Sequence, residues 1–141
     1  MYNFIHGGIS KDPRGQIRYV NEFDMKEVKR FYIIKNSDLE LIRGWRAHKI
    51  EQRWFYVLCG SFMISIVKID KWDKPDPSLV VENIVLDSEK NCLIHLPAGY
   101  GTAFKALEND SELLVFADHY LEDAHLDDYT FPPHYFINLS F

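Results

Sequence analysis

Short β-prone segments, separated by turn signals at nearly regular intervals, constrain the fold of this chain more than any other feature. About nine such segments can be counted along its length, and this spacing is typical of a β-sandwich or closed barrel. Aromatic residues make up 15% of the sequence, which favours strands over helices. We therefore predict an all-β fold, with a double-sheet jelly roll as the architecture, in a single domain spanning residues 1–141.

The predicted strands are bounded by glycine, proline and asparagine clusters. Gly60 and Ser61 separate two strongly apolar segments, and this two-residue spacing predicts a β-hairpin. Asp-Pro and Arg-Gly pairs at residues 12–15 predict a tight turn before the first strand. The segments interpreted as strands are 17–23, 31–37, 54–59, 62–69, 80–86, 92–96, 103–107 and 112–117, with 39–45 leading into a basic stretch.

The overall charge excludes some partners. The formal net charge is −5, so the chain lacks the basic footprint of a protein that binds nucleic acid non-specifically. We find neither a signal-peptide pattern nor a membrane-length apolar stretch, and we expect no membrane partner. Cys59 and Cys92 both lie in apolar runs, which predicts two packed, reduced thiols in a cytoplasmic protein.

One basic stretch leads directly into an apolar strand. Residues 43–62 read R-G-W-R-A-H-K-I-E-Q-R-W-F-Y-V-L-C-G-S-F, with five basic or imidazole side chains in the first eleven positions. Burying a charged group costs several kcal/mol unless it is paired or meets a ligand. In an acidic protein this local positive charge predicts a small anionic ligand, bound by side chains among Arg43, Arg46, His48, Lys49 and Arg53.

Two motifs in this sequence resemble those of the cupin superfamily. The first metal-binding motif of cupins aligns with Arg46, His48, Arg53 and Gly60, and the second aligns with Pro97, Gly99 and Thr102. Three of the four metal-ligand positions therefore hold other residues, and two of those are arginines. Guanidinium groups repel a divalent cation and offer it no lone pair, so we expect no metal and no other cofactor.

A closer resemblance is to the metal-free dTDP-4-dehydrorhamnose 3,5-epimerases and dTDP-sugar 3,4-ketoisomerases. It is carried by D-P-R-G at 12–15, R-G-W-R-A-H-K at 43–49, P-A-G-Y-G-T-A-F at 97–104 and A-D-H-Y-L-E-D at 117–123. The resemblance implies a cupin jelly roll that binds a nucleotide sugar and moves a proton through an enolate. It also implies a homodimer, and a role in surface-polysaccharide synthesis.

The same resemblance assigns catalytic roles. His48 matches the second histidine of the ketoisomerase pattern and is the predicted base, while Arg53 falls where epimerases keep an enolate-stabilising lysine. Arg46 is a second cation for the enolate, although it replaces the base histidine of the epimerases. Tyr120 is a candidate acid, because the epimerase acid tyrosine falls on Leu114 or Val115.

Substrate-binding roles follow from the resemblance too, and simpler interpretations stay open. Arg14 and Arg43 are expected near the diphosphate, with Lys49 and Tyr100 as further substrate contacts. In the alternative interpretation the arginines pair with carboxylates, and His48 is a hydrogen-bonded residue of the barrel wall. The leading alternative function is a non-catalytic cupin that binds a sugar nucleotide or another small anion. A metal-dependent cupin oxygenase is disfavoured.

His95 and the segment 125–128 also contain side chains that could take part in chemistry. His95 precedes the second motif and is interpreted as a structural neighbour of the site. The segment H-L-D-D at 125–128 contains adjacent aspartates, whose side chains point apart on an extended chain. We therefore interpret Asp127 and Asp128 as part of a solvated tail or a dimer contact, and not as metal ligands.

Overall fold

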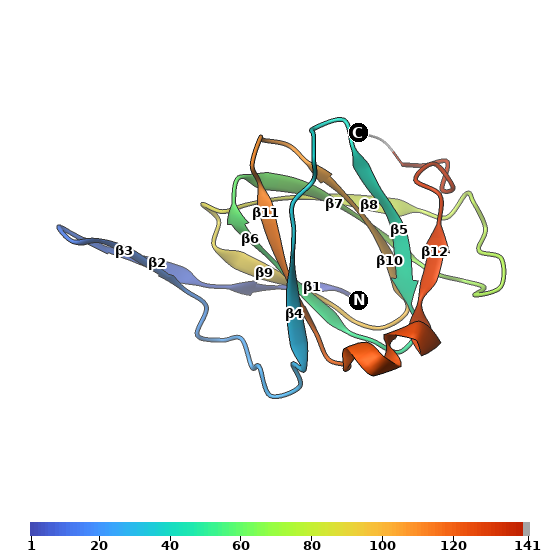
Figure 1. Cartoon of the computed structure of the whole chain (residues 1–141), viewed down its shortest axis with the longest axis horizontal. Helices are drawn as coiled ribbons and strands as arrows, with labels where there is room; N and C mark the ends of the chain where they lie inside the picture. The colour runs from blue at the N-terminus through green and yellow to red at the C-terminus, as the bar shows by residue number, and fades with distance from the viewer. Residues whose placement is uncertain (140–141) are drawn as a thin grey trace.

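The computed structural model describes residues 1–139 as an antiparallel β-sandwich (Figure 1). The two main sheets have five strands each and enclose one core, so the predicted all-β jelly roll is confirmed. The first sheet has the order β1 (Asn3–His6), β9 (Cys92–Leu96), β6 (Arg53–Cys59), β11 (Glu112–Ala117) and β4 (Arg30–Ile34). The second has the order β12 (Tyr129–Phe131), β5 (Ile42–His48), β10 (Tyr100–Ala106), β7 (Ser61–Lys68) and β8 (Val81–Asp87).

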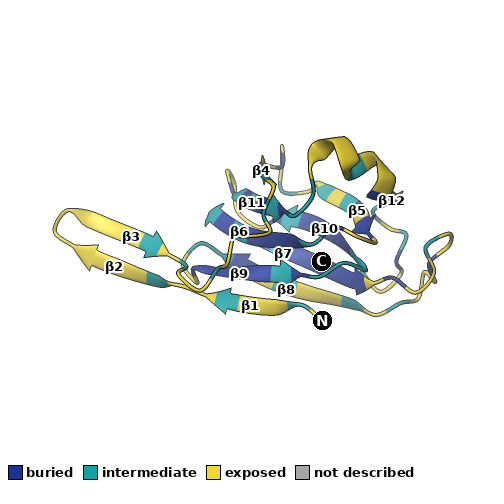
Figure 2. Ribbon diagram, turned by 90° about the horizontal axis from the view of Figure 1, so that it is seen from below, coloured by how far each residue is buried: buried dark blue, intermediate teal, exposed yellow. Residues whose placement is uncertain are grey.

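The core lies between the two sheets and is built by alternation along the strands. Phe55, Phe62, Ile64, Leu96 and Leu113 are among its buried members. Figure 2 shows the inner strands of both sheets as largely buried and the outlying strands as exposed. Burial of these aromatic and branched side chains supplies the main driving force for folding, at roughly 1.5–3 kcal/mol for each fully buried large side chain.

Consecutive strands β6 and β7 do not pair with each other, so the predicted hairpin at Gly60 and Ser61 is wrong. β6 pairs with β9 and β11, whereas β7 pairs with β8 and β10. Gly60 has φ +75° and forms a corner by which the chain crosses from one sheet to the other. A side chain at Gly60 would also meet Ser111, whose Oγ lies 2.0 Å from an ideal Cβ position. Gly60 therefore allows the chain to cross from one sheet to the other.

The N-terminal region contains more strand than predicted. β2 (Gly8–Asp12) and β3 (Gly15–Tyr19) form a two-stranded hairpin that projects from the sandwich (Figure 1). The predicted strand at 17–23 is therefore shifted toward the N-terminus, and its partner strand was missed. Arg18 fastens the base of the hairpin, since its guanidinium donates to the carbonyl oxygens of Ser88 and Leu58 at 2.9 and 2.7 Å.

The chain after β11 covers the outer face of the second sheet. It contains the 3-10 helix η1 (Leu121–Asp127) and β12, followed by a segment whose Phe136 packs edge-on against Trp45 at 4.9 Å between ring centroids. Much of the apolar segment 129–139 is therefore covered within one chain. No helix among residues 1–139 combines the length and apolar character needed to span a bilayer.

The two cysteines differ in their environment. Both are free thiols among the described residues, as predicted. Cys92 is buried in the core, but Cys59 is exposed at the end of β6, so its predicted packing is wrong. The β6 strand ends at this position, where the chain turns toward the other sheet and no element covers the side chain.

Candidate ligand-binding site

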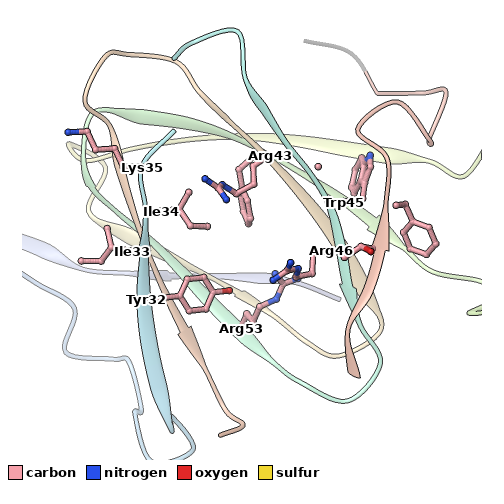
Figure 3. Close-up of a pocket in the computed structure, with 12 residues that line it drawn as sticks. Tyr32, Ile33, Ile34, Lys35, Arg43, Trp45, Arg46 and Arg53 are labelled. Carbon is pink, nitrogen blue, oxygen red and sulfur yellow. The ribbon is translucent and has the colours of Figure 1, made fainter. Parts of the chain in front are cut away.

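A cavity of about 670 Å³ opens between β4 of one sheet and β5 and β12 of the other (Figure 3). We call it the arginine cavity. It lies at one open edge of the sandwich, where the two sheets do not pair. The lining residues are Tyr32, Ile33, Ile34, Lys35, Arg43, Gly44, Trp45, Arg46, Arg53, Phe104, Thr130 and Phe131.

A β-bulge in β5 brings two arginines to the same cavity. Arg46 is opposite Thr102 of β10, and Arg43 is opposite Phe104. Three steps along β5 thus match two steps along β10, so β5 carries one extra residue. Without the bulge, side chains three residues apart on a strand would point to opposite faces. The bulge therefore explains how both guanidinium groups reach the cavity.

Arg53 provides a buried cation in the cavity wall. Only 2% of the residue is exposed, and its guanidinium lies 5.2 Å from the ring centroid of Phe55. Burial lowers the pKa of Arg53, and the neighbouring Tyr32 and Glu51 side chains oppose that effect. Within residues 1–139, its Nη2 has no hydrogen-bond partner and no carboxylate forms an ion pair with it. A buried, incompletely satisfied guanidinium facing a cavity is a candidate anion site.

The other two cavity arginines are only lightly engaged. Arg43 donates from Nε to Asn36 Oδ1 at 3.3 Å, and Arg46 Nε lies 3.3 Å from Asp128 Oδ1. The open interpretation that all three arginines pair with carboxylates therefore fails for Arg43 and Arg53 among the described residues. The nearby charge of Arg46 also lowers the pKa of Arg53, which shows that the two cations are close in space.

His48 lies beside this cavity but does not line it. The β5–β10 register places it opposite Tyr100, on the same side of the sheet as Arg46. Its ring is buried next to η1, in a smaller cavity of about 210 Å³. Its Nδ1 donates to the carbonyl oxygen of Asp127 at 2.7 Å, and its Nε2 lies 3.5 Å from Glu51 Oε2.

The electrostatic environment keeps His48 neutral. Burial lowers its pKa to about 4, and the charge of Arg53 acts in the same direction. The separation of 3.5 Å from Glu51 does not reverse this effect, because burial also raises the pKa of the Glu51 carboxyl. With Nδ1 holding the proton, Nε2 has a free lone pair. His48 is therefore unprotonated near neutral pH, although its low pKa makes it a weak base.

Asp127 contradicts the interpretation of its segment as solvated. It is 6% exposed, and its carboxylate accepts backbone N–H bonds from Lys49, Ile50 and Glu51 at 2.6, 2.9 and 2.7 Å. We call this arrangement the Asp127 clamp. It joins the end of η1 to the turn after β5. Among residues 1–139, no group of three or more histidine, cysteine, aspartate or glutamate side chains is placed to hold a metal ion.

Besides His48, four predicted site residues lie outside the arginine cavity. Arg14 is at the tip of the β2–β3 hairpin, where it pairs with Asp12 at 2.6 Å and is 89% exposed. Lys49 is exposed beside η1, and Tyr120 is exposed, with its ring 5.8 Å from the Lys29 ammonium. Tyr100 lines a different cavity at the opposite open edge of the sandwich.

Two other histidines also lie away from the cavity. His95 is on the outer face of the first sheet, where it stacks on Trp54 at 5.0 Å and contacts Gln52 through Nε2 at 2.8 Å. It therefore has the structural role that we expected, but it is not a neighbour of the site. His119 donates from Nδ1 to Asp118 Oδ1 at 2.6 Å. Neither imidazole faces the three arginines.

Sequence reasoning missed Tyr32, the one tyrosine among the residues that line the cavity. It lies on β4, opposite Val115 of β11, and so next to one of the positions where the epimerase acid tyrosine was expected. The signal was present, because Tyr32 is two residues from the buried Ile34 and must share its face. Thr102, at the second-motif histidine position, is buried with no partner for its Oγ1 among the described residues.

Comparison with known proteins now identifies the family. The model of the family described as "FdtA: WxcM-like, C-terminal" matches residues 2–139, which is nearly the whole chain. The chain belongs to the WxcM-like C-terminal (FdtA) family. The resemblance found in the sequence motifs is confirmed by this match at the level of the family, and by the similar structures below at the level of the fold. No functionally curated protein is significantly similar to it in sequence.

Solved structures similar to this WxcM-like chain have the same fold. QdtA, a sugar 3,4-ketoisomerase from Thermoanaerobacterium thermosaccharolyticum in complex with TDP, is 22% identical, with a TM-score of 0.67 over 87% of this chain and 84% of QdtA. ChmJ, a 3'-monoepimerase from Streptomyces bikiniensis in complex with dTDP-quinovose, is 18% identical, with a TM-score of 0.74 over 94% and 70%. The rmlC epimerase of Mycobacterium tuberculosis is 15% identical, with a TM-score of 0.77 over 99% and 74%. At these identities the comparison establishes the fold alone.

Proposed function

We propose that the chain binds a nucleotide-linked keto sugar in the arginine cavity and isomerises or epimerises it by metal-independent proton transfer. The observation that carries the proposal is Arg53, a buried guanidinium with an unpaired Nη2 that lines a cavity of about 670 Å³. A deprotonated keto sugar carries an enolate oxygen, and fixed cations in a partly dry cavity stabilise such a charge strongly. Similar folds in complex with dTDP and dTDP-sugars support this ligand class. The resemblance extends the proposal to cytoplasmic surface-polysaccharide synthesis.

The cavity residues divide the chemistry among them. Arg53 and Arg46 stabilise the enolate oxygen, and Arg43 binds the diphosphate. His48 is the proposed base, because burial and the nearby charge of Arg53 keep it unprotonated, and its Nδ1 donates to Asp127 so that Nε2 carries the lone pair. Tyr32 takes over the role that we first gave to Tyr120, because its phenol lies next to Arg53 and both side chains line the cavity.

A homodimer accommodates the predicted role of Arg14. The β2–β3 hairpin projects from its own sandwich, and Ile17 on it is 66% exposed. An isolated two-stranded hairpin is at best marginally stable in water, so packing on a second copy would stabilise it. In that arrangement Arg14 can reach a diphosphate in the cavity of the partner copy. Lys49 and Tyr100 do not line the arginine cavity of their own chain either. Their proposed binding roles therefore also require that they reach the cavity of the partner copy.

A second candidate function is sugar-nucleotide binding without turnover. It is favoured by one observation, which is that no imidazole is among the residues lining the arginine cavity. The His48 ring is buried and its Nδ1 is engaged by Asp127. Deprotonation beside a keto group then lacks a base in contact with the sugar.

Solvent exchange separates the two functions. The protein is incubated with dTDP-4-keto-6-deoxyglucose in D₂O, and deuterium at the carbons beside the keto group is followed by NMR, with binding measured in parallel by calorimetry. We expect exchange in the wild type, a loss of at least about 100-fold in His48→Gln, and retained binding in that variant. Binding without exchange removes the enzyme proposal and leaves the binding one. Absence of binding to any sugar nucleotide contradicts both.

A further inference from the structure

The arginine cavity carries more positive charge than a neutral sugar can offset. Four cationic side chains line it, and none of its lining residues is an aspartate or glutamate. Lys35 and Arg46 each meet one aspartate outside the lining at 3.3 Å, whereas Arg43 and Arg53 form no ion pair among the described residues. The whole chain has a net charge of −5, so this local excess is not a consequence of composition. Buried cations are stabilised by anions brought into the same site. The four side chains are Lys35, Arg43, Arg46 and Arg53.

These cations form two groups. Figure 3 shows the guanidinium groups of Arg46 and Arg53 together at one end of the cavity and that of Arg43 apart from them. The influence of Arg46 on the pKa of Arg53 confirms that the first two are neighbours. Lys35 lies beyond Arg43 and is 53% exposed at the rim. The cavity therefore offers two separate positions for negative charge.

The inner pair is suited to a carboxylate. Asp128 already shows how a carboxylate meets Arg46, with Oδ1 at 3.3 Å from Nε. The Nη2 of Arg53 remains unpaired beside it. Two adjacent guanidinium forks match the planar geometry of a carboxylate and leave Arg43 and Lys35 for a diphosphate. An enolate appears only during reaction, so it does not offset this charge in the bound ground state.

We infer that the cavity selects a nucleoside diphosphate sugar acid, in which the sugar itself carries a carboxylate that binds Arg46 and Arg53. The inference rests on the proposed function, because it specifies the sugar within the same site. A sugar with a hydroxymethyl or methyl group at that position adds no counter-charge, so Arg46 keeps only its exposed pairing with Asp128 and the Nη2 of Arg53 stays unpaired. Affinity should therefore depend on the sugar as well as on the nucleotide.

Two commercial ligands make a matched test. UDP-glucuronic acid and UDP-glucose differ only in having a carboxylate or a hydroxymethyl group at C6, and both are titrated into the full chain by isothermal calorimetry alongside UDP and dTDP. We expect UDP-glucuronic acid to bind at least about tenfold more tightly than UDP-glucose. If only thymidine nucleotides bind, the same comparison is made with dTDP-glucuronic acid and dTDP-glucose.

Variants locate the preference. Arg46→Met, at a side chain 58% exposed, should keep the fold and reduce the preference to less than about threefold. Arg43→Met should weaken the acidic and neutral ligands by the same factor. Arg53→Met is used only if its circular dichroism matches the wild type. Equal affinity for the acidic and neutral sugars overturns the inference and leaves the proposed function standing, whereas failure of every nucleotide to bind overturns the proposed function itself.

Discussion

Substitution of Asp127 tests whether the wall of the arginine cavity depends on the Asp127 clamp. The carboxylate accepts three backbone N–H bonds from the turn after β5, at 2.6 to 2.9 Å. β12, which starts two residues later at Tyr129, pairs with β5 and contributes Thr130 and Phe131 to the cavity. Asp127→Ala removes all three acceptor contacts while leaving the backbone carbonyl that binds His48.

The cost can be estimated from the exposure of the three donors. Lys49 and Ile50 are exposed, so water can replace the carboxylate at their N–H groups. Glu51 is 4% exposed, and its N–H would be left unsatisfied, at roughly 1–3 kcal/mol. With the loss of two charge-assisted bonds, we expect about 2–4 kcal/mol in the free energy of unfolding. For a chain of this size, that corresponds to a fall in Tm of roughly 6–15 °C.

Thermal unfolding followed by circular dichroism measures this effect. Asp128→Ala is the matched control, because the neighbouring aspartate is 39% exposed at its side chain and makes only the ion pair with Arg46. Such a pair contributes about 0–1 kcal/mol, so Tm should change by less than about 4 °C. Asp127→Asn keeps one acceptor oxygen, so its Tm should lie between those of the Asp127→Ala and Asp128→Ala variants. Equal Tm values for the Asp127→Ala and Asp128→Ala variants would refute the reasoning.

Two further predictions concern pH and anion affinity. The pKa of His48 is lowered from 6.5 to about 4. Between these two pH values the unfolded chain binds a proton at His48 that the folded chain does not bind. The free energy of unfolding should therefore fall by about 3 kcal/mol from pH 6.5 to 4. Glu51, with a raised pKa, acts in the opposite direction, so the test is whether urea unfolding of His48→Gln shows a smaller pH dependence than the wild type. Asp128→Asn frees Arg46 and should raise affinity for UDP-glucuronic acid about two- to fivefold by calorimetry, whereas Asp87→Asn, which loses an ion pair with Lys90 away from the cavity, should leave it unchanged.

Sequence pattern predicted the fold class but not the strand pairing. Alternation and turn spacing located the core strands, because burial on one face of a strand is written directly in residue order. Residue order does not show which strands pair with each other, and the link at Gly60 illustrates the reason. A two-residue link between apolar strands also fits a corner between two sheets, and only long-range packing decides between that corner and a hairpin.

The candidate site was predicted where it depends on strand residues and missed where it depends on the chain's path. Arg46 and Arg53 line the cavity as expected. Tyr120 does not, because the chain leaves β11 and enters η1 before that position. The Asp127 clamp was misinterpreted because adjacent aspartates do point apart, yet one of them meets backbone donors nearly 80 residues away in sequence.

The replacement of metal ligands by arginines changes what this cupin cavity can hold without changing its architecture. Arg46, Arg53 and Thr102 occupy positions that chelating cupins give to metal ligands, and the structure leaves Arg53 Nη2 and Thr102 Oγ1 unpartnered among the described residues. A fold that needed these groups only for packing would have satisfied both atoms internally, as buried polar groups usually are. Thr102 is not among the residues that line the arginine cavity, but Arg53 is, and its unmet hydrogen-bonding capacity is best explained by a ligand that brings its own negative charge to this cavity.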